Sequence, residues 1–233
     1  MRGCDRVVDD GRVSVAARVT RVVPHCHCRR DLVIAWRRRV IGKELIIVGG
    51  ANGAGKTTFA TEYASRYHCV YLGADAIATE LASDAPELVA VAAGEELLRR
   101  IATALAGEQR IVLESTLAGR TLRHVIGNAR DAGFKITIVY LFLDSADMCV
   151  ERVHERVLKG GHSVPEADIR RRFLRSIANF WWLYRPLADH WLLVYNSGNQ
   201  PLDVAAGTAE DVSVRDAELY AAFTHWTEGG NNG

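Results

Sequence analysis

Cysteine is scarce in this sequence, and long apolar segments are missing. The five cysteines among 233 residues are irregularly spaced, and the longest uncharged apolar runs have the length of a strand. These two absences exclude a disulfide scaffold and a membrane-spanning helix, which needs about 20 consecutive apolar residues. A chain with 48% hydrophobic residues can still bury one sizeable core. We therefore expect one main domain, a cytoplasmic location and no membrane partner.

Lysine and glutamate are absent from the first 39 residues. This segment contains ten arginines and four aspartates, which gives +6, and the remainder carries 19 basic and 24 acidic residues, which gives −5. Its apolar residues follow no helix or strand period, so we predict a disordered, Arg-rich extension over residues 1–39. An alternative is that the native protein starts near Val40, where the folded pattern begins. The motif His25-Cys26-His27-Cys28 lacks a second ligand pair, which argues against zinc.

Short apolar segments alternate with segments of helical period from residue 44 onward. Continuous apolar strands separated by helices indicate a parallel sheet covered on both faces. The sequence therefore predicts one α/β domain over residues 40–203, followed by a C-terminal helix and flexible tail over residues 204–233. The predicted strands are 44–48, 69–72, 111–115, 135–143 and 191–196, and the predicted helices are 56–67, 86–106, 119–132, 145–158 and one after Pro165.

A glycine-rich motif follows the first predicted strand. Residues 50–57, GANGAGKT, match GxxxxGK[ST] and precede a predicted helix, as this phosphate-binding motif requires. The glycines let successive N–H groups point at phosphate oxygens, the lysine bridges the outer phosphates and the hydroxyl binds Mg²⁺. We therefore expect ATP and Mg²⁺ as cofactors, with Thr57 as the metal ligand. The expected nucleotide-binding residues are Gly50, Ala51, Asn52, Gly53, Ala54, Gly55, Lys56, Thr57 and Thr58.

Three carboxylates, Asp75, Glu114 and Asp144, follow apolar strands. The carboxyl ends of parallel strands bind ligands, and phosphoryl transfer commonly uses a carboxylate near the attacking hydroxyl. For Asp144 we favour a helix cap, provided by this residue or by Ser145. Glu114 is followed by two hydroxyl residues, which is atypical of a core strand. Asp75 fits either a helix cap or a substrate contact, and the pattern leaves both open.

Six arginines flank the pair Gly160-Gly161. Arginine suits transferring phosphates, and a glycine pair between two helices is typical of a hinge, so we predict an Arg-rich helical lid. The stretch Ser163-Val164-Pro165-Glu166 predicts a capping box at the start of the second helix. We expect Trp181, Trp182 and Tyr184 to pack the end of that helix on the sheet. The arginines are Arg152, Arg156, Arg170, Arg171, Arg172 and Arg175.

Several blocks between residues 43 and 203 resemble, in order, the zeta-toxin-like P-loop kinase family, whose members include UDP-N-acetylglucosamine kinases. The blocks are KELIIVGGANGAGKTT, YLGADAIA, VLESTLAGR, GGHSVPEADIRRRF, NFWWLYRPLAD and YNSG. The resemblance implies a three-layer, nucleoside-kinase-like fold with a mostly parallel five-stranded sheet. It also implies transfer of the γ-phosphate of ATP to a hydroxyl of a UDP-N-acetylsugar. Because toxins of this family have antitoxins, an antitoxin protein is a candidate partner.

The resemblance also implies roles for individual residues. Asp75 matches the catalytic base, and Lys56 matches the catalytic lysine of the phosphate-binding loop. The block that contains Glu114, Thr116 and Arg120 contacts substrate in the toxins, although Ser115 replaces their glycine. The phosphate-binding arginines fall at Arg156 and at one of residues 170–172, which we take as Arg171.

Other functions stay open at this point. A kinase of a polynucleotide or an antibiotic could use the same core, and so could a P-loop ATPase switch that drives a partner protein. The charge of −5 beyond the extension argues against a nucleic acid acceptor or partner. The sequence also lacks the NKxD motif of GTPases and the LSGGQ-type motif of transporter ATPases.

Overall fold

The computed structural model describes residues 18–22, 42–82 and 89–229. Within these ranges a single sheet has the strand order β1-β8-β7-β6-β5-β2-β4-β3. The strands are β1 (Arg18–Val22), β2 (Glu44–Gly49), β3 (Val70–Leu72), β4 (Ile111–Ser115), β5 (Lys135–Phe142), β6 (His190–Tyr195), β7 (Leu202–Gly207) and β8 (Asp211–Val214).

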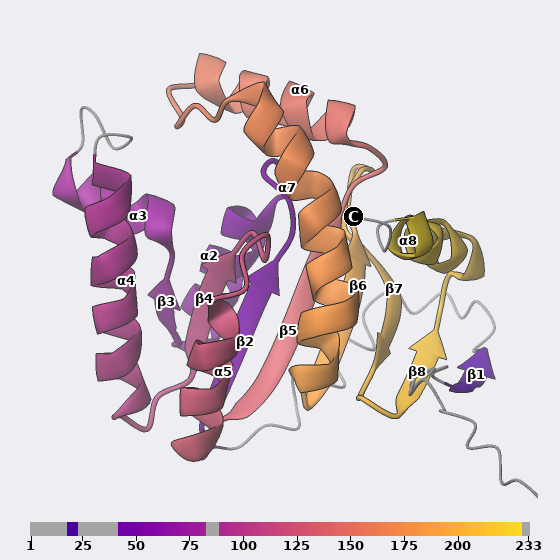
Figure 1. Cartoon of the computed structure of the whole chain (residues 1–233), viewed down its shortest axis with the longest axis horizontal. Helices are drawn as coiled ribbons and strands as arrows, with labels where there is room; N and C mark the ends of the chain where they lie inside the picture. Colours follow the sequence, from indigo (N-terminus) through magenta and orange to yellow (C-terminus); the bar gives the residue numbers. More distant parts are fainter. Residues whose placement is uncertain (1–17, 23–41, 83–88, 230–233) are drawn as a thin grey trace, which may run out of the picture.

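Helices cover both faces of this sheet (Figure 1). In the figure α2 lies behind the strands, α5 and α7 lie in front of them, and α6 crosses above their upper ends. The helices are α2 (Lys56–Tyr67), α3 (Ala74–Leu81), α4 (Ala90–Leu105), α5 (Leu122–Asp131), α6 (Ala146–Leu158), α7 (Glu166–Ala178) and α8 (Ala217–Gly229); the π-helix η2 (Asn179–Tyr184) and the 3₁₀ turn η3 (Arg185–Leu187) follow α7.

The central strands β3, β4, β2, β5 and β6 are all parallel. From β2 the chain crosses to β3 on one side, and from β4 it crosses back to β5 on the other. The carboxyl ends of β4, β2 and β5 therefore meet at the point where the direction of winding changes, which is where open α/β sheets bind ligands. This edge lies beneath α6 (Figure 1).

The core consists of the strands that the sequence shows as continuous apolar runs. Residues 45–48 of β2 are completely inaccessible to solvent, and residues 136–142 of β5 are buried. Burial of both faces explains why these strands read as unbroken apolar runs. α7 packs on this core through Ile169, Phe173 and Ile177, which are all buried.

The sheet is larger than the five strands predicted. The five predicted strands form the parallel block, and β7 and β8 extend it as an antiparallel hairpin at β6. Residues 204–233 were expected to hold a helix and a tail. The helix is present as α8, but this range also contains most of β7 and all of β8, which were not predicted. Residues 18–22 pair with β8 as an eighth strand, which differs from the disorder predicted there. The motif at residues 25–28 lies outside the described residues.

Two local predictions about helix starts have different outcomes. Ser145 is the N-cap of α6, and its hydroxyl accepts a hydrogen bond from the Met148 N–H at 3.1 Å, which confirms a cap in this region. The capping box before α7 is wrong. The chain enters α7 in an extended conformation at Pro165, and Glu166 begins the helix and pairs with Arg170 instead of reaching back.

The aromatic residues after α7 pack on the sheet only in part as expected. Trp181 and Tyr184 are buried, whereas Trp182 is 49% exposed and donates its indole N–H to the Thr227 carbonyl of α8. In the described ranges, none of the helices combines the length and the apolar character that a bilayer crossing needs.

Glu44 is a buried carboxylate at the opposite edge of the sheet, and it generates a testable prediction. Its Oε1 accepts a hydrogen bond from the Thr137 hydroxyl at 2.7 Å, while its Oε2 is buried without a hydrogen-bond partner. Burial raises the pKa of Glu44 above 4.5, although Thr137 and Arg110 act in the opposite direction. The folded state thus binds this proton more tightly than the unfolded state, and the associated stability is lost as pH rises through the raised pKa.

We therefore expect Glu44→Gln to remove part of the pH dependence of folding. Urea unfolding at a series of pH values from 4.5 upward should show the wild type losing free energy of unfolding relative to this variant. The exposed Glu95→Gln is the matched control and should follow the wild-type profile. Parallel profiles for wild type and Glu44→Gln would contradict the assignment.

Candidate active site

The glycine-rich loop between β2 and α2 adopts a conformation that depends on its glycines. Gly50, Gly53 and Gly55 have φ values of 144°, 80° and 88°, which side chains rarely tolerate. A Cβ at Gly50 would collide with the Leu141 carbonyl, and one at Gly55 would collide with the Asn196 amide. The Asn196 side chain also donates a hydrogen bond to the Ala54 carbonyl at 2.9 Å. The loop is therefore fixed from β5 and from the residue that follows β6.

Lys56 begins α2 and lies beneath this loop. Its side chain is buried, and its Nζ donates to the Ala51 carbonyl at 2.9 Å. Burial lowers the pKa of Lys56, and the carboxylates of Glu114 and Asp75 act in the opposite direction. No ion pair within 4.0 Å joins Lys56 to a carboxylate in the described part of the chain. A buried cation of this kind favours the approach of an anion.

Glu114 ends β4 directly beside the start of α2. Its Oε1 accepts a hydrogen bond from the Thr57 hydroxyl at 2.9 Å, and its Oε2 accepts one from the Tyr71 hydroxyl at 2.7 Å. Burial, and to a smaller extent the nearby Glu114 carboxylate, raises the pKa of Tyr71. The Tyr71 hydroxyl therefore stays protonated and acts as the donor in this hydrogen bond. The hydroxyl and carboxylate oxygens of Thr57 and Glu114 are thus adjacent, which suits a hard cation such as Mg²⁺.

Asp75 lies in the first turn of α3. The N-cap of this helix is Gly73, with no side-chain cap, so the alternative in which Asp75 caps the helix is wrong. The Asp75 side chain is exposed and lines the same cavity as Lys56, Thr57 and Glu114. A carboxylate at this position is free to accept a proton from a bound hydroxyl compound.

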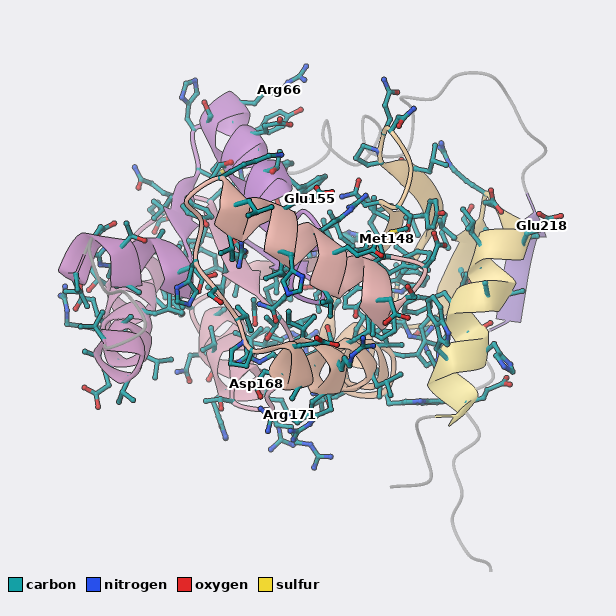
Figure 2. All side chains as sticks on the ribbon, turned by 90° about the horizontal axis from the view of Figure 1, so that it is seen from above. Arg66, Met148, Glu155, Asp168, Arg171 and Glu218 are labelled. Carbon is teal, nitrogen blue, oxygen red and sulfur yellow. The ribbon has the colours of Figure 1, made fainter. Side chains whose placement is uncertain are left out.

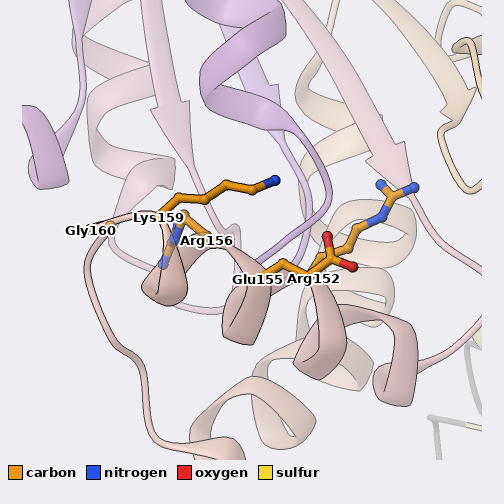
Figure 3. Close-up of a pocket in the computed structure, with 6 residues that line it drawn as sticks. Arg152, Glu155, Arg156, Lys159 and Gly160 are labelled. Atoms are coloured by element: carbon orange, nitrogen blue, oxygen red, sulfur yellow. The ribbon is translucent and has the colours of Figure 1, made fainter.

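Arginines from α6 approach the glycine-rich loop from above. Arg152 donates to the Ser197 carbonyl at 3.3 Å and Arg156 donates to the His162 carbonyl at 2.7 Å, while the Nε of Arg156 is buried without a hydrogen-bond partner. Both line a smaller cavity of about 470 Å³ along α6, together with Glu155 and Lys159 (Figure 3). Both also line the larger cavity described below.

Arginines from α7 close the other side of the site. Arg171, Arg172 and Arg175 line the larger cavity, and Arg172 donates to the Asn52 side chain of the loop at 3.5 Å. Figure 2 shows α6 and α7 side by side from above, with Asp168 and Arg171 on the first turns of α7. Arg170 is held by Asp147 and Glu166, each at 2.7 Å, and is not among the lining residues.

The cavity that these elements enclose has a volume of about 590 Å³, which is within the range of small-molecule sites. Most of the predicted site residues line it. Arg120 does not; it is exposed and follows the lining residue Gly119. Gly50, Ala51 and Ala54 of the loop are buried and are not among the lining residues. The predicted residues that line the cavity are Asn52, Gly53, Gly55, Lys56, Thr57, Thr58, Asp75, Glu114, Thr116, Arg156 and Arg171.

Sequence reasoning placed Arg152, Arg172 and Arg175 in the predicted lid but did not choose them as site residues, although all three line the cavity. For Arg172 the choice among residues 170–172 was made in favour of Arg171; Arg152 and Arg175 were passed over. The signal that could have found them is helical spacing, because each lies four residues from an arginine that was chosen, Arg156 and Arg171. Within the described residues, no group of three or more histidine, cysteine, aspartate or glutamate side chains could hold a metal ion. An ion at Thr57 would therefore need oxygens from a bound phosphate, which is how Mg²⁺ is usually held.

A family of proteins described as AAA domains has a sequence model that matches residues 45–176. An uncharacterized protein of Haemophilus influenzae is 25% identical over 134 residues, which cover 58% of this chain and 95% of that protein. The family match includes the glycine-rich loop, Asp75, Glu114 and the arginines of α6 and α7.

Solved structures share the fold. A chain of the AvrRxo1-ORF1:AvrRxo1-ORF2 complex, crystallised with sulphate ions, matches with a TM-score of 0.62 at 19% identity and covers 78% of this chain; this chain spans 63% of its length. The complex crystallised with ATP gives the same values. A chain of the PezAT toxin–antitoxin system of Streptococcus pneumoniae matches with a TM-score of 0.51 at 12% identity, covering 75% of this chain and 79% of that one. The fold is an α/β P-loop kinase-like fold with a mostly parallel sheet.

The conformation of the glycine-rich loop yields a prediction about ATP, the ligand expected from the motif. Gly55→Ala places a side chain at φ 88° and against Asn196, so it should lower the affinity for ATP at least about tenfold. Gly127→Ala is the matched control, because Gly127 lies on the exposed face of α5 and an added Cβ meets nothing within 4 Å. This control should keep wild-type affinity and gain about 0.5–1 kcal/mol of stability.

Titration with a fluorescent ATP analogue and thermal unfolding measure both effects. Equal ATP affinity for Gly55→Ala and Gly127→Ala would show that the loop conformation is not needed for nucleotide binding.

Proposed function

The chain belongs to the AAA domain family, and on that premise we propose that it is an ATP- and Mg²⁺-dependent kinase of a small anionic alcohol. The observation that carries the proposal is the cavity itself. It brings a buried P-loop lysine, a hydroxyl–carboxylate pair, an exposed aspartate and arginines from two helices together around one space. These are the groups that phosphoryl transfer needs, because its catalysis depends on positioning and charge stabilisation.

The loop and Lys56 bind the phosphates of ATP. The loop glycines expose backbone N–H groups at the start of α2. The Lys56 Nζ donates to the Ala51 carbonyl at 2.9 Å, and it exchanges this hydrogen bond for one to a phosphate oxygen when ATP binds. The ATP-bound AvrRxo1 complex, which shares the fold, supports this assignment. The remaining loop residues that line the cavity are Asn52, Gly53, Gly55, Thr57 and Thr58.

Thr57 and Glu114 would hold Mg²⁺ together with the phosphates of the nucleotide. The chemistry that the ion would supply there is neutralisation of charge on the transferring phosphate. The Thr57 hydroxyl and Glu114 Oε1 lie 2.9 Å apart, so both oxygens would be available to such an ion. Tyr71 fixes the carboxylate for that role through its 2.7 Å hydrogen bond.

Asp75 acts as the catalytic base. Asp75 is exposed and lines the cavity. Among the described residues, its carboxylate has no hydrogen bond or ion pair that an acceptor would have to displace. It accepts the proton of the acceptor hydroxyl as that oxygen attacks the γ-phosphorus and the bond to the β-phosphate oxygen breaks. The arginines that line the cavity, among them Arg156 and Arg171, stabilise the charge on the transferring phosphoryl group.

The charge around the cavity favours an anionic acceptor such as a UDP-N-acetylsugar. Arg171, Arg172 and Arg175 line its wall on the α7 side. A diphosphate would satisfy this set of cations, whereas a cationic antibiotic would be repelled. The volume of about 590 Å³ also fits a small molecule better than a polynucleotide.

A protein partner is a second part of the proposal. PezAT is a toxin–antitoxin system, and the AvrRxo1 structures contain two different proteins. A partner that covers the arginines of α7 would block the acceptor side of the cavity, which is the simplest way to restrain such a kinase. Co-purification from the native source tests this idea, and a nucleotide-dependent complex without phosphoryl transfer would favour a switch over a kinase.

The first experiment is transfer of labelled γ-phosphate from ATP to UDP-N-acetylglucosamine. We expect transfer by the wild type and none detectable by Lys56→Ala, which also loses ATP affinity. Asp75→Asn should keep ATP affinity within about twofold but lose at least about 10²-fold in turnover, because it lacks the base. The exposed Asp131→Asn on α5 is the matched control and should behave as the wild type.

Full turnover by Asp75→Asn would refute the base assignment. If the wild type binds ATP but transfers no label, the acceptor is a different hydroxyl compound, and a screen of anionic metabolites and RNA follows.

A further inference from the structure

The turn after β4 forms one wall of the cavity and has an unusual backbone. We call residues 115–119 the acceptor-side turn; Ser115, Thr116, Ala118 and Gly119 line the cavity. Leu117 between them is buried, and its φ is 56°, a left-handed conformation that is rare for a branched residue. The Leu117 side chain packs against Gly49, whose missing Cβ makes room for it. Such a backbone persists only where the surroundings hold it.

Three side chains from the α7–η2 segment hold this turn by its carbonyl oxygens. The Ser176 hydroxyl donates to the Thr116 carbonyl. The Asn179 amide donates to the Leu117 carbonyl at 2.8 Å and to the Gly119 carbonyl at 3.4 Å. The Tyr184 hydroxyl donates to the Gly119 carbonyl at 2.6 Å. The Ser115 and Thr116 hydroxyls accept hydrogen bonds from the Leu117 and Ala118 N–H groups at 3.2 and 3.4 Å, and both residues line the cavity.

The holding side chains are themselves fixed. Ser176 is completely buried and accepts a hydrogen bond from the Tyr140 hydroxyl of β5 at 2.9 Å. Tyr184 is also completely buried. Asn179 and Tyr184 are the first and last residues of the π-helix η2, and a π-helical segment inside a longer helix often marks a functional site. We call Ser176, Asn179 and Tyr184 the clamp; through α7 and η2 it connects the sheet to the acceptor-side turn.

The same helix carries the arginines of the cavity one turn earlier. Arg171, Arg172 and Arg175 line the cavity, and Ser176 and Asn179 follow on the same continuous helix. In the function proposed above Arg171 contacts the transferring phosphoryl group of the nucleotide, so nucleotide binding acts on the helix that holds the acceptor-side turn.

We propose that Ser176, Asn179 and Tyr184 are positioning residues that set the acceptor-side turn for the acceptor and couple it to nucleotide binding through α7. The proposal rests on the kinase function proposed above. An acceptor bound against Ser115 and Thr116 shares its cavity with Asp75, the proposed base. Loss of the clamp should weaken the acceptor while leaving the phosphate-binding loop intact.

Steady-state transfer from ATP to UDP-N-acetylglucosamine tests the clamp. Tyr184→Phe removes one hydroxyl and keeps the ring, and Asn179→Ala removes the amide. Tyr184→Phe loses one hydrogen bond to the turn and should raise KM for the sugar nucleotide about five- to tenfold; Asn179→Ala loses two and should raise it at least as much. Both should change KM for ATP less than about twofold. Tyr220→Phe, which removes a tyrosine hydroxyl from α8, is the matched control and should change neither KM. Equal rises in both KM values would overturn the proposal.

Hydrogen exchange provides a readout that does not depend on the identity of the acceptor. The Mg²⁺ complex of a non-hydrolysable ATP analogue should slow amide exchange in peptides that span residues 115–121 of the wild type and of Tyr220→Phe. This protection should be lost in Tyr184→Phe and Asn179→Ala at saturating analogue, with unchanged analogue affinity. Equal protection in all four proteins would overturn the coupling. If the wild type transfers nothing to UDP-N-acetylglucosamine, the proposed acceptor fails and the exchange result alone decides the clamp.

Discussion

The parallel pairing of β2 with both β4 and β5 is the constraint on which the site depends. Val48 is in register with Glu114, and Gly49 is in register with Ser115 and Tyr140. Because these strands end together, the loop after β2 and the carboxylate at the end of β4 meet through one hydrogen bond from Thr57. The buried apolar residues of β2 hold this register, since a shift by one residue would turn Glu114 to the opposite face of the sheet.

The charges at this edge of the sheet are unequally paired. Arg170 is bound by two carboxylates, and Arg171 by Asp168, so these contacts tie α7 together and to α6. Lys56 and Arg156, in contrast, donate to backbone carbonyls, which satisfy hydrogen bonds but do not neutralise charge. The interior of the cavity is therefore positive where the loop and helices meet and negative at Asp75 and Glu114. A phosphate and a hydroxyl are the groups that such a division of charge can bind side by side.

The parts of the fold that sequence reasoning located have strong local signals. β4 and α2 have the predicted bounds. An unbroken apolar run and a glycine-rich turn are local patterns, so they can be recognised without knowledge of the elements that pack against them. β7 and β8 were missed because their residues are small or polar, and they are stable as strands only through pairing with β6 and with each other. The capping box before α7 failed because the extended entry through Pro165 excludes it.

The sequence by itself determined the phosphate-binding loop, the parallel core and the arginine-rich pair of helices, because glycine spacing, apolar runs and helical periods are properties of neighbouring residues. Only the tertiary structure decided that Asp75 faces the cavity instead of capping α3 and that Arg170 is held away from it by ion pairs. It also decided that Glu114 is shared by Thr57 and Tyr71 and that the turn at Leu117 is held from α7. These contacts join residues up to 65 positions apart, and no local pattern records them.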